Sequence, residues 1–198
     1  CLFLSSIYVS SIISKYLFLL FPIQKKYAII VNMKQHNFIL ASGSPRRLQM
    51  MKEKNIIPLV MPSSADESLP FSMNKETAVM YLALKKALDV ESRLEADCSQ
   101  VILAADTIVY YDGIIGKPKS REDALNILKK LRGKSHDVIT GVAILKANSP
   151  LRTVFYQVST VHFKSYPMEE IEAYVDTEEP YDKAGGYAIQ GTFSKYIR

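Results

Sequence analysis

The fold is decided at Phe38-Ile39-Leu40-Ala41-Ser42-Gly43-Ser44-Pro45-Arg46-Arg47-Leu48, where an apolar strand runs into a small-residue turn and then into a helix. Ser44 is expected to cap this helix through its hydroxyl, and Pro45 suits the first helical position because its missing N–H would have no partner there. Unpaired amides at the helix start and the side chains of Arg46 and Arg47 would then meet at one point. The stretch predicts a site for an anion such as phosphate; an ordinary strand–helix junction with two solvated arginines is the alternative.

A long helix is predicted over 74–94, with Asn74 as its N-cap. Lys86 falls on the apolar stripe of this helix, whereas Lys85 points elsewhere and is expected to be ordinary surface. An inward lysine needs an anion, unless its stem packs along the edge of the core and its ammonium reaches water. The stripe itself consists of Val79, Leu82, Ala83, Ala87 and Val90.

Asp106 ends a short apolar run, 100–106, that is typical of a strand buried on both faces. Because α/β proteins place their sites at the ends of such strands, the carboxylate is a candidate functional group. Burying it unpartnered would cost several kcal/mol, so a cation, a donor or water should meet it. The alternative is a structural aspartate bonded to loop amides. Thr107 adds a hydroxyl, and the strand continues to a hairpin turn at 112–113.

Several further polar residues lie in predicted loops. Asp66 and Glu67 are adjacent acids in the loop 62–68, which follows a predicted edge strand over 56–61. Lys117 lies between a glycine and a proline, and Lys183 lies in the glycine-bearing loop 181–187. Gln190 carries an amide that can donate and accept at once, as recognition of a base edge requires. Solvated surface positions are the alternative for the two acids, Lys117 and Gln190.

The remaining elements indicate a mixed α/β protein. We predict a helix over 120–131 with a capping pair, Ser120 and Asp123, a hairpin of antiparallel strands over 135–145 and 153–163, and a last helix over 167–175. The three histidines lack the spacing of a zinc site, and His136 is expected to be structural. The chemistry therefore rests on cations and carboxylates.

The quoted stretch resembles the signature of the Maf family, whose members are nucleoside triphosphate pyrophosphatases. Later segments match in the family's order, at 82–87, 104–109, 116–118, 135–140 and 179–191. The resemblance implies an α/β fold with a mixed, elongated sheet flanked by helices, two lobes around a cleft, and a homodimer as the family's assembly. It also implies hydrolysis of a nucleoside triphosphate to the monophosphate and pyrophosphate, and the Ile-Gln-Gly sequence around Gln190 matches the branch that acts on dTTP and UTP.

Roles for individual residues follow from this resemblance. Asp106 would accept the proton of the attacking water or bind the metal that activates it, and both roles stay open. A divalent metal, Mg²⁺ or Mn²⁺, would be held by Asp106 together with Asp66 or Glu67, with Glu67 slightly preferred. Lys86 and Lys117 would act with Asp106 in catalysis. Substrate binding and specificity would fall to Ser44, Arg46, Arg47, Thr107, Lys183 and Gln190.

Charge and cysteine content exclude other classes of function. The 198 residues carry a formal charge of +5, but Lys15, Lys25 and Lys26 supply three of these charges and no acidic residue lies before Met33, which leaves about +2 from Met33 onward. This balance argues against a nucleic-acid partner. Two cysteines without a metal-binding or redox spacing favour a reduced, cytoplasmic compartment.

Both ends of the sequence raise alternatives. Residues 2–23 are apolar enough to cross a bilayer, yet the chain begins with cysteine and Met33 lies just before the first family motif. We therefore expect 1–32 to be a non-native or mispredicted extension of a domain over 33–198, rather than a membrane or targeting segment. The family continues beyond Gly191 through a further strand and helix, so a C-terminally truncated, catalytically weak or inactive nucleotide-binding relative in division control is the alternative function.

Overall fold

The computed structural model describes residues 37–198, so the expected extension over 1–32 lies outside the described residues. The chain divides into two compact units. In its described part, unit 1 contains 37–70, Met80–Ala105 and Val142–Phe155; unit 2 contains Phe71–Val79, Asp106–Gly141 and Tyr156–Arg198. Within 37–198, no helix is both long and apolar enough to span a bilayer.

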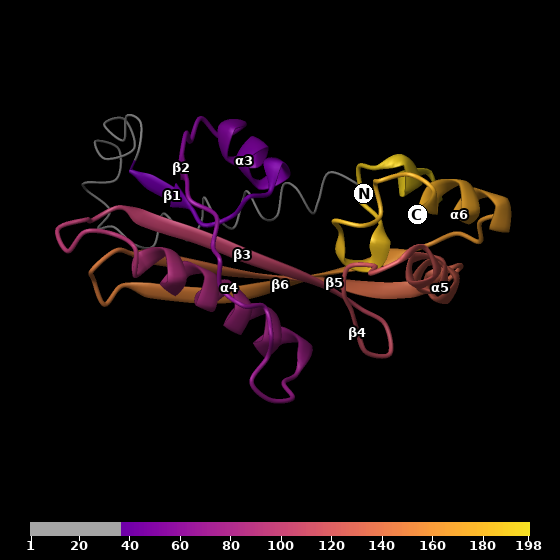
Figure 1. Cartoon of the computed structure of the whole chain (residues 1–198), viewed down its shortest axis with the longest axis horizontal. Helices are drawn as coiled ribbons and strands as arrows, with labels where there is room; N and C mark the ends of the chain where they lie inside the picture. Colours follow the sequence, from indigo (N-terminus) through magenta and orange to yellow (C-terminus); the bar gives the residue numbers. More distant parts are fainter. Residues whose placement is uncertain (1–36) are drawn as a thin grey trace. The chain divides into compact units, whose positions relative to one another are not determined.

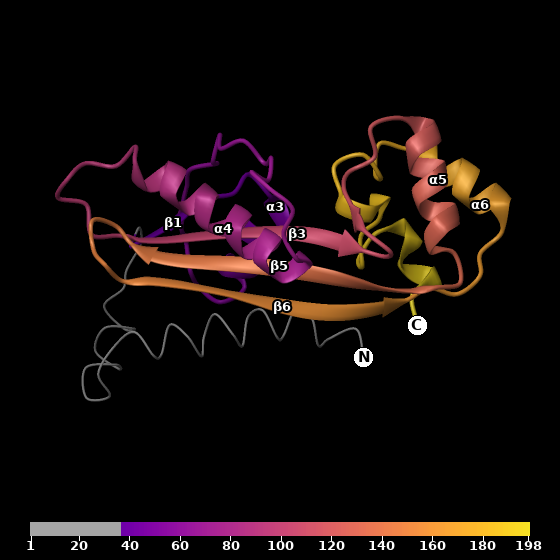
Figure 2. The same cartoon turned by 90° about the horizontal axis from the view of Figure 1, so that it is seen from below.

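The described residues form a six-stranded sheet in the order β2-β1-β3-β5-β6, with β4 paired to β3 (Figure 1). β1 pairs in parallel with β2 and with β3, whereas β4 pairs antiparallel with β3, so the sheet is mixed as predicted. β5 and β6 run in opposite directions and form the predicted hairpin (Figure 2). The strands are β1 (Phe38–Leu40), β2 (Leu59–Val60), β3 (Val101–Tyr110), β4 (Ile114–Ile115), β5 (Ser135–Lys146) and β6 (Arg152–His162).

Unit 1 has the layered construction of an α/β protein. Alternate residues of β1 point to opposite faces, so Ile39 packs in one apolar cluster with residues of α4 (Lys75–Glu91), while Phe38 and Leu40 pack in another with Met51 of α3 (Pro45–Lys52). All five residues of the predicted α4 stripe are buried. The predicted cap is confirmed by the hydrogen bond from the Thr77 N–H to Asn74 Oδ1 at 2.7 Å.

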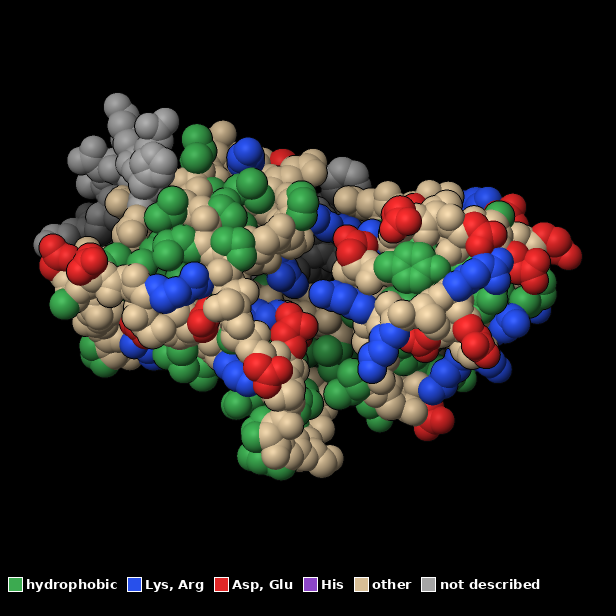
Figure 3. Space-filling model, in the orientation of Figure 1, with side chains coloured by type: hydrophobic (Ala, Val, Ile, Leu, Met, Phe, Trp, Pro, Cys, Tyr) green, Lys and Arg blue, Asp and Glu red, His purple; other side chains and the backbone are tan. Residues whose placement is uncertain are grey.

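The edge strand β2 is shorter than the predicted strand over 56–61 but lies at the edge of the sheet, as predicted. Leu59 and Val60 are exposed on it. Figure 3 shows surface hydrophobic side chains of unit 1 in the region where Figure 1 draws β1 and β2. The helix before this strand ends at Lys52, and Asn55 follows in a left-handed conformation with φ of 59°.

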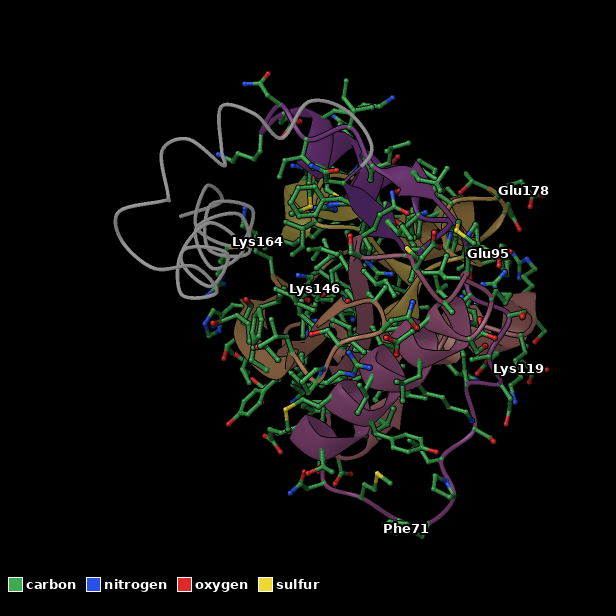
Figure 4. The ribbon with its side chains drawn as sticks, turned by 90° about the vertical axis from the view of Figure 1, so that its left-hand side faces the viewer. Phe71, Glu95, Lys119, Lys146, Lys164 and Glu178 are labelled. Atoms are coloured by element: carbon green, nitrogen blue, oxygen red, sulfur yellow. The ribbon has the colours of Figure 1, made fainter. Side chains whose placement is uncertain are left out.

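Unit 2 contains α5 (Arg121–Leu131), α6 (Met168–Val175) and two short 3-10 helices, η2 (Ala184–Gly186) and η3 (Thr192–Tyr196). The side chain of Ser120 accepts from the Asp123 N–H and confirms the predicted start of α5. α5 packs against α6 and η2 around a core rich in aromatic rings. Phe71 is 68% exposed, and Figure 4 shows it at the tip of the loop before α4.

Candidate functional site

The turn between β1 and α3 is organised by Ser42, which the sequence did not single out. Its buried hydroxyl accepts from the Ser44 N–H at 3.2 Å and from Arg47 Nη1 at 3.0 Å. Ser44 is the N-cap residue, but its side chain makes no capping hydrogen bond, so the predicted capping role of its hydroxyl is wrong. The reason is that a serine hydroxyl can close a turn onto the N–H two residues ahead, and here Ser42 does so. Arg46 is half-buried beside this turn.

Two neighbouring acids of the loop 62–68 pair with two neighbouring lysines of α4. Lys86 Nζ lies 2.7 Å from Glu67 Oε1, and Lys85 Nζ lies 3.7 Å from Asp66 Oδ2. The Lys86 side chain is 14% exposed and that of Lys85 is 31% exposed. The inward lysine therefore meets an anion, as its place on the stripe predicted, and Lys85 has an acidic partner that the sequence did not predict.

The first part of that loop is fastened to α4 by Asp89. Its carboxylate accepts from the Ser63 hydroxyl at 2.8 Å and from the Ser64 N–H at 3.0 Å, and these bonds, the first foremost, lower the pKa of Asp89. Further along the loop, the side-chain and backbone donors of Ser68 lower the pKa of Asp66, and Lys85 adds to the effect. The loop is thus held by α4 at its start and at its acidic pair.

In unit 2, Asp106 is buried within β3, with 8% of its surface exposed. The next residue, Thr107, has its hydroxyl 3.0 Å from that of Thr140 on β5. Thr140 was not predicted as a site residue. Its signal in the sequence was its place in the 135–140 family segment, on the strand that neighbours β3.

The two glycine-bearing loops of unit 2 contact each other. The Gly185 N–H donates to the Gly116 carbonyl at 2.9 Å, directly before Lys117. Gly185 has a φ of 75°, and a Cβ there would lie 2.8 Å from Val109 Cγ2, so both the backbone angle and the available space favour glycine at this position. Lys183 donates to the Glu179 carbonyl at 2.7 Å. Lys117 and Gln190 are exposed.

His136 belongs to the buried interior of unit 2. Its Nε2 and the Tyr187 hydroxyl are 2.6 Å apart, and its ring packs against those of Tyr187 and Phe163. Burial lowers the pKa of His136 to about 4, because the charged imidazolium loses its hydration there. This environment suits a neutral, packed histidine.

Within residues 37–198, no group of three or more His, Cys, Asp or Glu side chains is arranged to hold a metal ion. Asp66 and Glu67 lie in unit 1 and Asp106 lies in unit 2. Their role as metal ligands stays a prediction. The same holds for the substrate contacts expected of Ser44, Arg46, Arg47, Thr107, Lys183 and Gln190.

The family model described as Maf-like protein matches residues 37–198. Among curated relatives, the "dTTP/UTP pyrophosphatase" of Caldicellulosiruptor bescii is 44% identical over 155 residues, 77% of this chain and 78% of the relative. The protein of the same name from Alkaliphilus oremlandii is 40% identical over 165 residues, 83% of this chain and 84% of the relative. Among solved structures, the Staphylococcus aureus Ham1 protein matches 65% of this chain and 72% of its own, with a TM-score of 0.44 and 14% identity.

Proposed function

The chain belongs to the Maf-like protein family, and we propose that it is a nucleoside triphosphate pyrophosphatase that hydrolyses dTTP or UTP to the nucleoside monophosphate and pyrophosphate. The observation that carries this proposal is the 40–44% identity to relatives named dTTP/UTP pyrophosphatase over about four fifths of both chains. The lysine, arginine, aspartate and glutamate side chains described above suit this chemistry.

The cations would bind the polyphosphate. A nucleoside triphosphate brings several negative charges, and its transfer reactions depend on groups that neutralise them. Lys86 supports this role because its largely buried ammonium is already held at an anion, the Glu67 carboxylate at 2.7 Å. In our proposal a phosphate oxygen takes the place of that carboxylate, and Arg46 and Lys117 supply further positive charge.

Asp106 would serve the attacking water. Its carboxylate either accepts the proton that the water loses on attacking the α-phosphorus, or holds a divalent metal. Its burial at 8% exposure supports a specific role over a solvated one, since buried carboxylates are rare without a partner. Thr107 follows it in β3 and, with its hydroxyl fixed by Thr140, would contact the nucleotide.

The acidic pair suits a divalent metal in its chemistry. Carboxylate oxygens are the hard donors that Mg²⁺ and Mn²⁺ prefer, and Asp66 and Glu67 are 71% and 57% exposed at their side chains. Together with Asp106 they are the residues that would hold such an ion. When bound, the metal would neutralise charge on the phosphate oxygens.

Selection among nucleotides would rest on residues around these groups. Gln190 is exposed and offers both a donor and an acceptor to a base edge, which supports a role in recognising a pyrimidine. Ser44, Arg47 and Lys183 would add contacts to the phosphates or sugar. Arg47 is already oriented by Ser42, which favours a fixed guanidinium over a mobile one.

The test is pyrophosphate release by the purified chain from a panel of dTTP, UTP, CTP, GTP and methylated GTP, with Mg²⁺ or Mn²⁺ and again with EDTA. We expect release from dTTP or UTP, and a loss of at least about 100-fold in kcat in Asp106→Asn, the range of a lost acid–base group. Asp112→Asn is the matched control, because Asp112 is an exposed turn residue with φ of 52°, which asparagine also tolerates.

A folded Asp106→Asn variant with wild-type turnover would overturn the assignment of Asp106. A folded wild-type chain that releases pyrophosphate from no nucleotide would overturn the proposed activity. Calorimetry with dTTP then separates a nucleotide-binding protein without turnover, which still gives binding heat, from a chain with neither property.

A further inference from the structure

The segment 116–118, which carries Lys117, contacts the turn at Gly185 and Gly186 near the C-terminal end of the sequence. Gly116 accepts a hydrogen bond from the Gly185 N–H at 2.9 Å, and a Cβ on Gly186 would lie 3.2 Å from Pro118 Cγ. The residues on both sides of Lys117 therefore contact the Gly185-Gly186 turn. Any shift of that turn would move the Lys117 backbone.

The Gly185-Gly186 turn is held in place by the residue that follows it, Tyr187. Gly185 and Gly186 have φ of 75° and 69°, so the chain reverses sharply before it enters Tyr187. Tyr187 is 5% exposed and its hydroxyl lies 2.6 Å from His136 Nε2. Since His136 is part of β5, this bond ties the glycine turn to a strand of the sheet.

The bond is one that the protein cannot easily replace. His136 is 3% exposed, and its other ring nitrogen, Nδ1, has no hydrogen-bond partner among the described residues. A buried polar group that loses its partner bears the full cost of its desolvation, which gives a buried pair a strong preference for one geometry. The edge-on packing of the two rings, 86° apart in plane, adds to this preference.

We infer that His136 and Tyr187 are positioning residues, whose buried hydrogen bond sets the Gly185-Gly186 turn and through it the place of Lys117 in the reaction. The inference rests on the proposed role of Lys117 as a phosphate ligand. It gives His136 a positioning role, which is distinct from that of a general base or a zinc ligand. The hydrogen bond acts on Lys117 at a distance, so neither ring needs to touch the nucleotide.

The test measures KM and kcat for dTTP or UTP in Tyr187→Phe, Lys117→Ala and the double variant. Tyr187→Phe keeps the ring and removes only the hydroxyl. We expect it to raise KM about tenfold, the range for a binding group displaced by a fraction of an ångström. In the Lys117→Ala background the same change should have no further effect on KM, because the group that it misplaces is gone.

Tyr166→Phe is the matched control. Tyr166 lies fully buried in the same core, and its hydroxyl donates to the Leu128 carbonyl of α5 at 2.6 Å rather than to His136. A general loosening of the core would raise KM in both phenylalanine variants, and in the Lys117→Ala background as well. His136→Gln and His136→Leu serve as a second pair of probes. The glutamine amide can replace the Nε2 contact, so KM should stay closer to the wild-type value in His136→Gln than in His136→Leu.

The outcomes separate this inference from the proposed function. A wild-type chain without turnover contradicts the proposed function. A normal wild-type chain with an unchanged KM in Tyr187→Phe overturns the inference alone, as does an additive effect in the double variant. If Lys117→Ala itself matches the wild type, there is nothing to position and the inference also fails. Should Tyr187→Phe not fold, the same comparison is made with His136→Gln and His136→Leu.

Discussion

Lys85 and Lys86 are adjacent on α4 and both pair with acids, yet their surroundings differ. Lys86 is 14% exposed with its partner at 2.7 Å, whereas Lys85 is 31% exposed with its partner at 3.7 Å. We expect Lys86→Met to lower kcat/KM for dTTP or UTP by about 10- to 100-fold, because a charge-assisted phosphate contact is lost from a partly desolvated site. Lys85→Met, the control, should stay within about threefold of the wild type.

The measurement is steady-state pyrophosphate release by both variants, together with their thermal unfolding. Methionine keeps the apolar stem of each lysine, so both proteins should remain folded. Equal losses in the two variants would mean that general positive charge, rather than the Lys86 position, supports activity. No loss in Lys86→Met would remove this lysine from the proposed phosphate ligands.

The direction of Lys86 could be predicted because helical periodicity fixes which residues share a face. The role of Ser42 could not, since Ser42 and Ser44 are equivalent choices for a hydroxyl that closes a turn. Which serine does so depends on backbone angles such as the ψ of 116° at Ser44. Ion pairs between distant segments, such as that of Asp66 with Lys85, could not be predicted from the sequence either.

Among the elements, the η2 turn places the strictest demand on residue type. Gly185 combines a φ of 75° with a space in which a Cβ would lie 2.8 Å from Val109 Cγ2. We expect Gly185→Ala to lower the free energy of unfolding by about 2–3 kcal/mol, from left-handed strain and the clash together. Urea unfolding measures the loss.

Gly116→Ala is the control for this change. Nothing lies within 4 Å of a Cβ built on Gly116, although Gly116 accepts the Gly185 hydrogen bond. Its stability should stay within about 0.5 kcal/mol of the wild type, as for a surface substitution. If both variants unfold at the same urea concentration as the wild type, the turn is able to relax and the close packing at Gly185 is not restrictive.

Most elements could be predicted from local signals. The caps at Asn74 and Ser120, the 3.6-residue stripe of α4 and the turn between β5 and β6 are encoded within a few residues. β2 could be placed only roughly, because two residues pair with β1 and their limits depend on that partner. Asn55 lies beyond the end of α3 in a left-handed conformation. There the Ile56 N–H donates a hydrogen bond to the Met51 carbonyl, which closes the turn after the helix.

At the scale of the whole molecule, the sequence indicated a mixed α/β sheet but not its order. The order β2-β1-β3-β5-β6 brings together strands that are far apart in the chain, such as β1 and β3. The family resemblance supplied the fold class, since periodicity alone leaves many arrangements of the same strands open. The roles of Asp66, Glu67 and Asp106 stay predictions, because these roles depend on the nucleotide and the metal as much as on the fold.

The stability of the whole molecule should depend on pH through His136. Burial is the main cause that lowers its pKa from 6.5 to about 4; His162 lowers it further and Asp137 opposes the shift. As pH falls below 6.5 the unfolded chain therefore takes up a proton that the folded chain refuses. The free energy of unfolding should be fully retained above pH 6.5 and fall by about 3 kcal/mol by pH 4, at about 1.4 kcal/mol per pKa unit.

Urea unfolding at intervals from pH 7.5 to pH 4 checks this, with His136→Gln as the control. The variant is less stable at neutral pH but has no imidazole at this position to titrate, so the difference between the two proteins should shrink as the pH falls. Asp137 does not confuse the result, because the Lys75 hydrogen bond lowers its pKa and its stabilising effect is lost at lower pH than that of His136. A constant difference across the range would show that His136 titrates alike in the folded and unfolded chains.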